Sequence, residues 1–450
     1  MTLPKGWVET TVGEVVRPIE TANPAGELNS TFRYVDIGAI DNRLLSITEP
    51  KEILGRDAPS RARRRIRNGD ILFSTVRPYL KNIAQVPADL DGEITSTGIC
   101  VLRGQEGVES GFLFRRVASQ DFIDAMTRAS DGTMYPAIAD KDVFSGAISL
   151  PPAAEQRRIV AKLDALTARL ARARAELDRV PVLAERLREV ALRKAYSPVT
   201  ASAELGEALD TSIDGRTLPV YSLAVDWTWH ALGTIAAVTG GLTKNAKRAT
   251  LQMQVPYLRV ANVYANALRL DDIATIGCTP AELTKTRVEP GDILVVEGNG
   301  SLDQVGRAAV WSGEIAGCSH QNHLIRVRAG ASVLPEFLLW WLLSPEGRSR
   351  IERLAASTSG LHTLSISKIS GLPIPAPSLP VQETIVSSIK SAFARADRME
   401  AEAARARALI DRLEAAILAK AFRGELVPQD PDDEPAGVLL DRIREARAAG

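Results

Sequence analysis

Apolar residues recur at alternating steps of four and three along two otherwise polar stretches of the chain. The first stretch contains Ile159, Leu163, Leu166, Leu170, Ala173, Leu177 and Val180, and the second contains Ile385, Ile389, Ala392, Ala396, Met399, Ala403, Ala406, Ile410, Leu413 and Ile417. This spacing is typical of a coiled-coil seam, and the Ala, Leu, Glu and Arg around it favour helix. The pattern predicts two long helices. Because an interior proline removes a main-chain hydrogen bond, we expect Pro181 to kink or break the first.

A seam this narrow needs a partner helix, so we expect the two helices to pair with each other. The alternative is that each helix packs on its own globular domain.

Elsewhere, β-branched runs at Phe32–Ile40, Asp70–Val76 and Glu93–Leu102 alternate with turn signals, which indicates mixed α/β domains. The apolar run Phe337–Leu343 predicts a buried helix.

The chain contains an internal repeat. Gly69-Asp70-Ile71-Leu72 recurs as Gly291-Asp292-Ile293-Leu294, and Pro151 with Gln156 recurs as Pro377 with Gln382. The offset stays between 220 and 228 residues along the chain, so one module occurs twice. We therefore predict an α+β fold with two tandem mixed α/β domains, two long helices and pseudo-two-fold symmetry. The expected parts are a first domain at 1–150, a first helix at 151–196, a linker at 197–220, a second domain at 221–376, a second helix at 377–423 and a tail at 424–450.

Composition narrows the functional classes. The 55 basic side chains balance the 55 acidic ones, so any nucleic-acid-binding surface must be a local patch. Three scattered cysteines, Cys100, Cys278 and Cys318, exclude a disulfide framework and fit a reducing compartment. The N-terminus lacks an apolar signal segment and no run is long enough to span a bilayer. We expect a cytoplasmic protein with no membrane partner.

Motifs for catalysis are missing from the sequence. It contains no phosphate-binding GxxxxGK[ST] loop, no HExxH and no GxSxG. Cys318-Ser319-His320-Gln321-Asn322-His323 offers Cys and His at short spacing, but no fourth zinc ligand is evident and the segment leads into a predicted strand. We expect a polar strand end here and no metal site.

Two kinds of segment are candidates for nucleic-acid contact. The first is a basic cluster before the strand at Asp70, with a smaller basic group in the second module; guanidinium groups suit phosphates and guanine edges. The second consists of polar loops after equivalent strands, which differ between the copies while the framework matches. The alternatives are solvated turns and drifted surface loops. The candidates are Arg61, Arg63, Arg64, Arg65, Ser74, Thr75, Arg77, Tyr79, Lys81, Thr95, Ser96, Thr97, Thr133 and Tyr135 in the first module, and Lys244, Lys247, Asn299, Ser301, Gln304, Arg307, His320, Gln321, Asn322, Ser359 and His362 in the second.

The sequence resembles the specificity subunits of type I restriction-modification systems along essentially its whole length. The residues that carry the resemblance are Leu3–Trp7 with Gly13–Val15, Gly69–Arg77, Leu150–Pro152 with Glu155–Val160, and Ala421–Leu426. Their order, the duplication and the heptad helices together make the resemblance specific.

The resemblance implies two target-recognition domains that each read one half of a bipartite double-stranded DNA sequence, separated by an antiparallel helix pair that sets the gap. It also implies that two modification subunits bind S-adenosylmethionine and methylate adenine, and that two restriction subunits use ATP and Mg to translocate and cut DNA. The chain itself would bind no cofactor and catalyse nothing. Two other functions stay open: an enzyme with its own methyltransferase or nuclease activity, and a structural coiled-coil connector without sequence preference.

Overall fold

The computed structural model describes residues 3–129, 136–196, 211–213, 216–218, 223, 226–355 and 362–449. The chain forms two compact units, Met1–Leu177 with Ala406–Gly450, and Asp178–Arg405. Each unit contains one copy of the repeated α/β module and one stretch of the helix pair.

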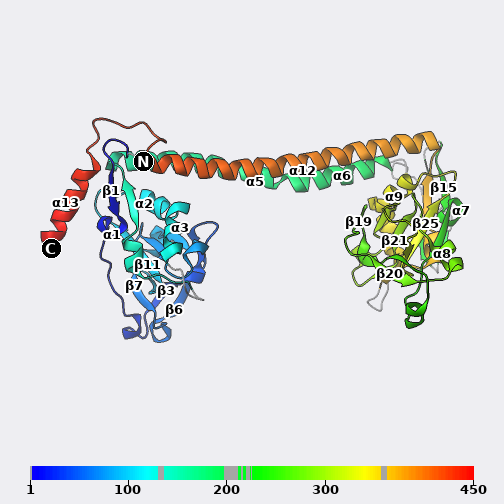
Figure 1. Cartoon of the computed structure of the whole chain (residues 1–450), viewed down its shortest axis with the longest axis horizontal. Helices are drawn as coiled ribbons and strands as arrows, with labels where there is room; N and C mark the ends of the chain where they lie inside the picture. The colour runs from blue at the N-terminus through cyan, green and yellow to red at the C-terminus, as the bar shows by residue number, and fades with distance from the viewer. Residues whose placement is uncertain are drawn as a thin grey trace. The chain divides into compact units, whose positions relative to one another are not determined.

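The first unit is built around two four-stranded sheets with the orders β6-β3-β10-β7 and β2-β11-β8-β9. Figure 1 shows α2 and α3 beside β11, and side chains from α2, β8 and β11 share one core with the start of α5. The strands are β1 (Val8–Thr11), β2 (Val16–Arg17), β3 (Thr31–Val35), β4 (Ile40–Asp41), β5 (Ser46–Ile47), β6 (Lys51–Leu54), β7 (Ala62–Arg65), β8 (Ile71–Ser74), β9 (Ile83–Gln85), β10 (Ile94–Ser96), β11 (Ile99–Gly104) and β12 (Ala147–Leu150). The helices are α1 (Val12–Val15), α2 (Ser110–Val117), α3 (Gln120–Ala129), α4 (Asp140–Phe144), α5 (Ala153–Asp178) and α13 (Ala436–Ala449).

The second unit repeats this arrangement with sheets β16-β25-β21-β23 and β20-β17-β24. Helix α9 packs against β23 and β25, and Figure 1 shows it beside β25; its aromatic side chains share a core with β21 and α12. The strands are β13 (Thr211–Ile213), β14 (Arg216–Leu218), β15 (Thr228–Ala231), β16 (Ala236–Gly240), β17 (Gln254–Leu258), β18 (Val263–Tyr264), β19 (Ala267–Leu268), β20 (Ala274–Gly277), β21 (Ile293–Val296), β22 (Gly298–Asn299), β23 (Ala308–Val310), β24 (Ser319–His320), β25 (Leu324–Ala329), β26 (His362–Thr363) and β27 (Pro373–Ala376). The helices are α6 (Val180–Ala195), α7 (Leu232–Ile235), α8 (Pro280–Thr286), α9 (Pro335–Leu343), α10 (Pro345–Ala355), α11 (Ile366–Ser370) and α12 (Leu379–Phe422).

The strand orders confirm the predicted duplication. The sheets β2-β11-β8-β9 and β16-β25-β21-β23 place equivalent strands in the same order, and the parallel pair β3–β10 corresponds to the parallel pair β17–β24. One element differs. The first unit has strand β7 at the edge of its other sheet, whereas the second has helix α8 at the same point of the repeat. This explains why the basic cluster of the first copy has no aligned counterpart.

The repeated Gly-Asp motif forms the same Asp–Arg ion pair in both copies, and the aspartate is buried in each, whereas the arginine side chain is 9 % exposed in the first copy and 35 % exposed in the second. Asp70 accepts hydrogen bonds from the Arg103 guanidinium at 2.9 and 2.8 Å, and Asp292 accepts two from Arg328 at 2.7 Å. Each aspartate also accepts a main-chain N–H of the preceding turn. Gly69 has a φ of +84°, a conformation that glycine adopts without strain. The motif therefore stabilises the turn and the strands that form the framework of each unit.

The repeated Pro and Gln residues join each long helix to the domain beside it. The Gln156 amide donates to the carbonyl of Pro151 and accepts the N–H of the residue that caps α2. Gln382 makes the same two contacts, with Pro377 and with the residue that caps α9. Both glutamines are fully buried.

The long helices pair antiparallel within each unit, which confirms the predicted mutual pairing. In the first unit Arg174 of α5 contacts Asp411 and Glu414 of α12. Further along α5, the carbonyl of Leu177 accepts a hydrogen bond from Arg407, which lies earlier on α12. The partner numbers fall as the α5 numbers rise, so the two helices run in opposite directions.

The seam of α12 differs by one residue from the predicted seam at Leu413. Leu413 is half exposed, and its neighbour Glu414 faces α5 and meets Arg174 at 2.6 Å. A charged side chain therefore occupies this seam position, where the sequence pattern predicted an apolar one. At Met399, which is partly buried, the neighbouring Glu400 bonds to Arg188 of α6 at 2.7 Å. The predicted seam residues Ile159, Leu163 and Ile389 are buried, and Leu166, Leu170, Leu177, Ile385, Met399, Ile410 and Ile417 are partly buried.

The predicted break at Pro181 is confirmed. Helix α5 ends at Asp178 and α6 begins at Val180, whereas α12 continues through 44 residues. The buried helix predicted at Phe337–Leu343 is α9.

Candidate nucleic-acid interface

The basic cluster of the first unit is partly used by the fold itself. Arg64 on β7 donates to the carbonyl of Ile99 at 2.6 Å and pairs with Asp140, and Arg65 donates to a main-chain carbonyl at 2.7 Å. Arg63 bonds to the carbonyl of Ser60 at 3.1 Å and to Asn23. These three arginines hold β7 to its surroundings. Only the exposed Arg61 makes no side-chain contact of this kind among the described residues.

Arg61 and Thr97 lie together at the exposed end of β7. The N–H of Thr97 donates to the carbonyl of Arg61 at 2.9 Å, and both side chains are exposed. Two predicted contact residues that are 36 positions apart in sequence thus lie side by side on the surface of the first unit.

Four predicted contact residues of the first unit face the interior instead of solvent. Ser74, Thr75, Thr95 and Ser96 are 0 to 6 % exposed. Their hydroxyls bond main-chain groups of nearby strands and loops, and that of Thr95 donates to the carbonyl of Val35 on β3 at 2.6 Å. A buried hydroxyl needs such a partner, so these side chains stabilise the loops. We correct the prediction that they contact DNA.

The loop after β8 presents side chains from a constrained backbone. Arg77 and Lys81 have φ values of +50° and +54°, on either side of a short turn at Pro78–Leu80. Such conformations are uncommon for residues other than glycine and concentrate at functional sites. Tyr79 in this turn is 48 % exposed. This loop remains a candidate contact segment.

In the second unit, two predicted loops are joined by a pair of short strands. Asn299 on β22 pairs with His362 on β26. Ser301, which follows Asn299, is exposed, and Gln304 bonds to Asp303. The structure thus brings together two candidate segments that are 63 residues apart in sequence. Thr133, Tyr135 and Ser359 lie outside the described residues.

A second group gathers around the loop after β16. Lys244 and Lys247 are exposed, and the carbonyl of Leu242 in the same loop accepts the N–H of Asn322 at 3.0 Å. The Gln321 amide oxygen accepts a main-chain N–H at 3.4 Å. These partly exposed polar groups remain candidates.

His320 does not reach the surface. Its ring is fully buried on β24, and Nδ1 donates to the carbonyl of Thr286 at 2.9 Å. Burial lowers the pKa of the imidazole to about 4, although the Thr286 bond opposes this shift. We correct the prediction that His320 contacts DNA: it is a neutral core residue.

The predicted residue Arg307 belongs to a cluster that the sequence pattern did not reveal. Its guanidinium carbon lies 5.2 Å from the ring centre of Tyr264, and that of Arg269 lies 4.3 Å from the same ring. Tyr264 and Arg269 belong to the β18–β19 hairpin region, about 40 residues before Arg307 in the sequence. No motif or spacing marks them, because the contact depends on how the hairpin packs on β23.

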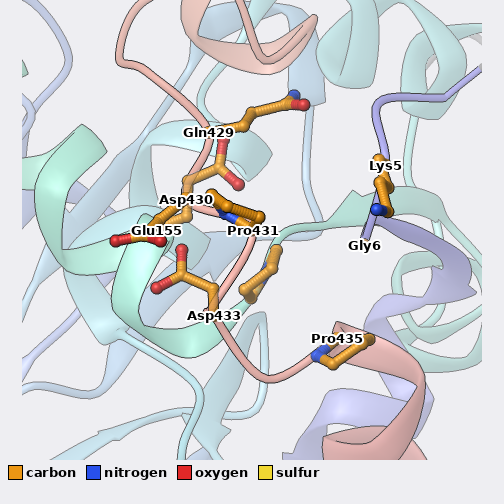
Figure 2. Close-up of a pocket in the computed structure, with 9 residues that line it drawn as sticks. Lys5, Gly6, Glu155, Gln429, Asp430, Pro431, Asp433 and Pro435 are labelled. Atoms are coloured by element: carbon orange, nitrogen blue, oxygen red, sulfur yellow. The ribbon is translucent and has the colours of Figure 1, made fainter.

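A pocket of about 270 Å³ lies where the N-terminal segment, the start of α5 and the C-terminal tail meet. Figure 2 shows Glu155 and Asp433 among the residues that line it, with Lys5 across from them. Glu155 is 1 % exposed and accepts the indole N–H of Trp7 at 3.0 Å; burial raises the pKa of its carboxyl group. Arg158 binds Asp433 at 2.5 Å and lowers the pKa of that carboxyl group. This ion pair attaches the C-terminal tail to α5.

The described residues contain no group of three or more His, Cys, Asp or Glu side chains arranged to hold a metal ion. Among them there is also no helix with the length and apolar character needed to cross a membrane.

Several known proteins that are similar to the chain in sequence or structure are specificity subunits of type I restriction systems. No model of a protein family matches the chain. The type I restriction enzyme EcoKI specificity subunit of Escherichia coli strain K12 is 28 % identical over 365 residues, which cover 78 % of this chain and 74 % of that protein. The type I restriction enzyme StySPI specificity subunit of Salmonella potsdam is 31 % identical over 313 residues, 67 % of this chain and 64 % of that protein.

A solved structure extends the similarity to the whole fold. The HsdS subunit from Thermoanaerobacter tengcongensis is 33 % identical, with a TM-score of 0.68, and the match covers 95 % of this chain and 99 % of that one. Identity at this level over nearly the full length of both chains, together with the similarity of the folds, establishes common membership. The chain belongs to the specificity subunits of type I restriction-modification systems.

Proposed function

We propose that this specificity subunit reads a bipartite double-stranded DNA sequence, with one half-site contacted by each unit, and that it catalyses no reaction itself. The observation that supports this is the contrast between framework and loops. Both units have the same strand order in one four-stranded sheet, the same Asp–Arg ion pair and the same Pro–Gln joint. The exposed groups around this framework differ, as expected for two readers of different sequences.

We further propose that the helix pair sets the gap between the half-sites. An unbroken helix of 44 residues is about 66 Å long at 1.5 Å per residue. The cross-helix ion pairs fix the register of the two helices, so the length of the pair is defined by the sequence. A spacer of defined length would give a fixed number of intervening base pairs.

The catalytic work would then belong to partner proteins in the cytoplasm. We propose that two modification subunits, which bind S-adenosylmethionine, dock near the two Pro–Gln joints, and that two restriction subunits supply the ATP- and Mg-dependent steps. The pseudo-two-fold repeat offers two equivalent positions to two copies of one partner. The pocket in Figure 2, which lies beside the start of α5 and the C-terminal tail, would belong to one of these positions.

Single substitutions in the two units test the half-site assignment. Arg77→Ala in the first unit should relax one half of the methylated motif, and His362→Ala in the second should relax the other half, because each unit contacts separate bases. A base contact typically contributes about 1–3 kcal/mol of discrimination. The measurement is the sequence motif of methylated adenines in cells that express each variant with its modification subunit. If either variant altered both halves, the assignment of one half-site to each unit would be wrong.

Methyl transfer by the purified chain alone tests the second part of the proposal. We expect none with S-adenosylmethionine and DNA, and full activity when the modification subunit is added. Activity of the chain alone would instead support an enzyme.

A further inference from the structure

The second unit has an aromatic ring with two guanidinium groups over it. The guanidinium carbons of Arg269 and Arg307 lie 4.3 and 5.2 Å from the ring centre of Tyr264. Arg269 is exposed, whereas Arg307 and Tyr264 are half-buried. Since both cations are this close to one ring, they are closer to each other than about one Debye length, roughly 10 Å at 0.1 M salt.

Neither cation is neutralised by the part of the chain that the structure describes. Among those residues, Arg269 and Arg307 form no ion pair and donate no side-chain hydrogen bond, and the buried Nε of Arg307 has no acceptor. Other arginines of the same unit differ: Arg259 pairs with Asp272, and Arg248 pairs with Glu282. Two neighbouring cations without a counter-charge repel each other and leave strong donors unused. Their arrangement is suited to an external anion.

The first copy shows that the fold does not require these residues. There, the β4–β5 hairpin packs against β9 as the β18–β19 region packs against β23. The strand registers place Asp41 at the position of Tyr264 and Asn82 at the position of Arg307. The aromatic ring and the Arg307 cation were therefore not retained in both copies as parts of the framework.

We propose that Arg269 and Arg307, held in place by Tyr264, form a phosphate clamp that binds the DNA backbone at the half-site contacted by the second unit. Guanidinium groups bind phosphate through paired hydrogen bonds, and stacking on an aromatic ring orients them in advance. Such contacts contribute affinity and position without selecting a base. The clamp rests on the proposed DNA-reading function, and it assigns Arg307 to the backbone instead of a base.

Salt dependence of binding separates a phosphate contact from a base contact. The full chain with its modification subunits would be titrated with a duplex carrying its methylated motif and with a scrambled duplex, at several NaCl concentrations. The slope of log Kd against log [NaCl] should fall by about 0.9 for each phosphate that is no longer bound. We expect a decrease of about 1.8 for the double variant Arg269→Gln/Arg307→Gln. Lys285→Gln, which removes one exposed charge from α8 of the same unit, should leave the slope unchanged.

The ratio of affinities for the two duplexes provides the second readout. It should stay unchanged in the double variant, which would also show that the variant is folded. An unchanged slope, or a collapse of the ratio, would overturn the clamp while leaving DNA reading intact. If the unsubstituted complex bound neither duplex, the proposed function itself would fail, and the clamp with it.

Discussion

Asp70 and Arg103 illustrate the kind of interaction that fixes each unit at the level of single residues. Their ion pair is almost fully buried, with 9 % of the arginine side chain and 2 % of the aspartate exposed. Removing one partner of such a pair typically costs about 3–5 kcal/mol, because the other charge stays buried without compensation. The repeat of Gly69-Asp70 as Gly291-Asp292 is visible in the sequence. The arginine partners are not, because they lie 33 and 36 residues away on another strand.

His320 makes the stability of the second unit depend on pH. Its folded pKa of about 4 lies below the ordinary value of 6.5. Above pH 6.5 the imidazole is neutral in both states and contributes no pH dependence. Between pH 6.5 and 4 the unfolded chain binds a proton that the folded chain does not, so the free energy of unfolding falls by up to about 3 kcal/mol.

Replacement of this histidine gives the test. In His320→Gln the part of the pH dependence between 6.5 and 4 should be missing, as measured by urea unfolding at several pH values. The parent chain, measured under the same conditions, is the reference for this comparison. Equal pH profiles for the parent and His320→Gln would show that His320 titrates normally.

At the scale of elements, the helix periodicity was the most informative part of the sequence. It predicted two long helices and their pairing, and the interior Pro181 predicted the break in the first helix. It misplaced Leu413 because heptad spacing identifies the seam only to within one residue, and Glu414 meets Arg174 instead. The different elements at β7 and α8 could not be predicted, since both segments lie at the edge of a repeated sheet where either structure fits.

Arg407 compensates the break in the first helix. Pro181 lacks the N–H that would donate to the carbonyl of Leu177 in a regular helix, and Arg407 of α12 donates to that carbonyl at 2.8 Å. Arg407→Met should therefore lower the free energy of unfolding by about 1–2 kcal/mol. Arg412→Met on the same helix should change it little, because Arg412 is exposed and bonds only within its own helix.

A double-mutant cycle isolates this role. In a Pro181→Ala background the restored N–H can donate to Leu177, so Arg407→Met should cost clearly less than in the parent chain. The quantity to compare is the free energy of unfolding in urea for the four proteins of the cycle. Equal costs in both backgrounds would mean that Arg407 stabilises the helix pair in some other way.

For the whole molecule, the duplication was predictable because its landmarks keep a nearly constant offset. The surfaces that differ between the copies were only partly predictable. Ser74, Thr75, Thr95, Ser96 and His320 were polar residues near loops, and the sequence could not show that they are buried. Exposure depends on how strands pack, which is also why the Tyr264 cluster was missed.

The length of the helix pair should determine the gap in the recognised sequence. Inserting seven residues, one heptad, at facing positions of α5 and α12 preserves the seam and adds about 10 Å, equivalent to about three base pairs. The methylated motif should keep both halves and gain about three intervening base pairs. The same insertion in α5 alone breaks the register and should abolish methylation. A motif with an unchanged gap after the paired insertion would exclude the helix pair as the spacer.

The most direct test of the account is a genome-wide map of methylated adenines in cells that express this chain together with its modification subunit, compared with cells that express the modification subunit alone. We predict one new bipartite motif with a fixed gap, present only when the chain is expressed. A soluble complex that added no methylated motif, or one whose motif was the same without this chain, would contradict the claim that the chain selects the DNA sequence.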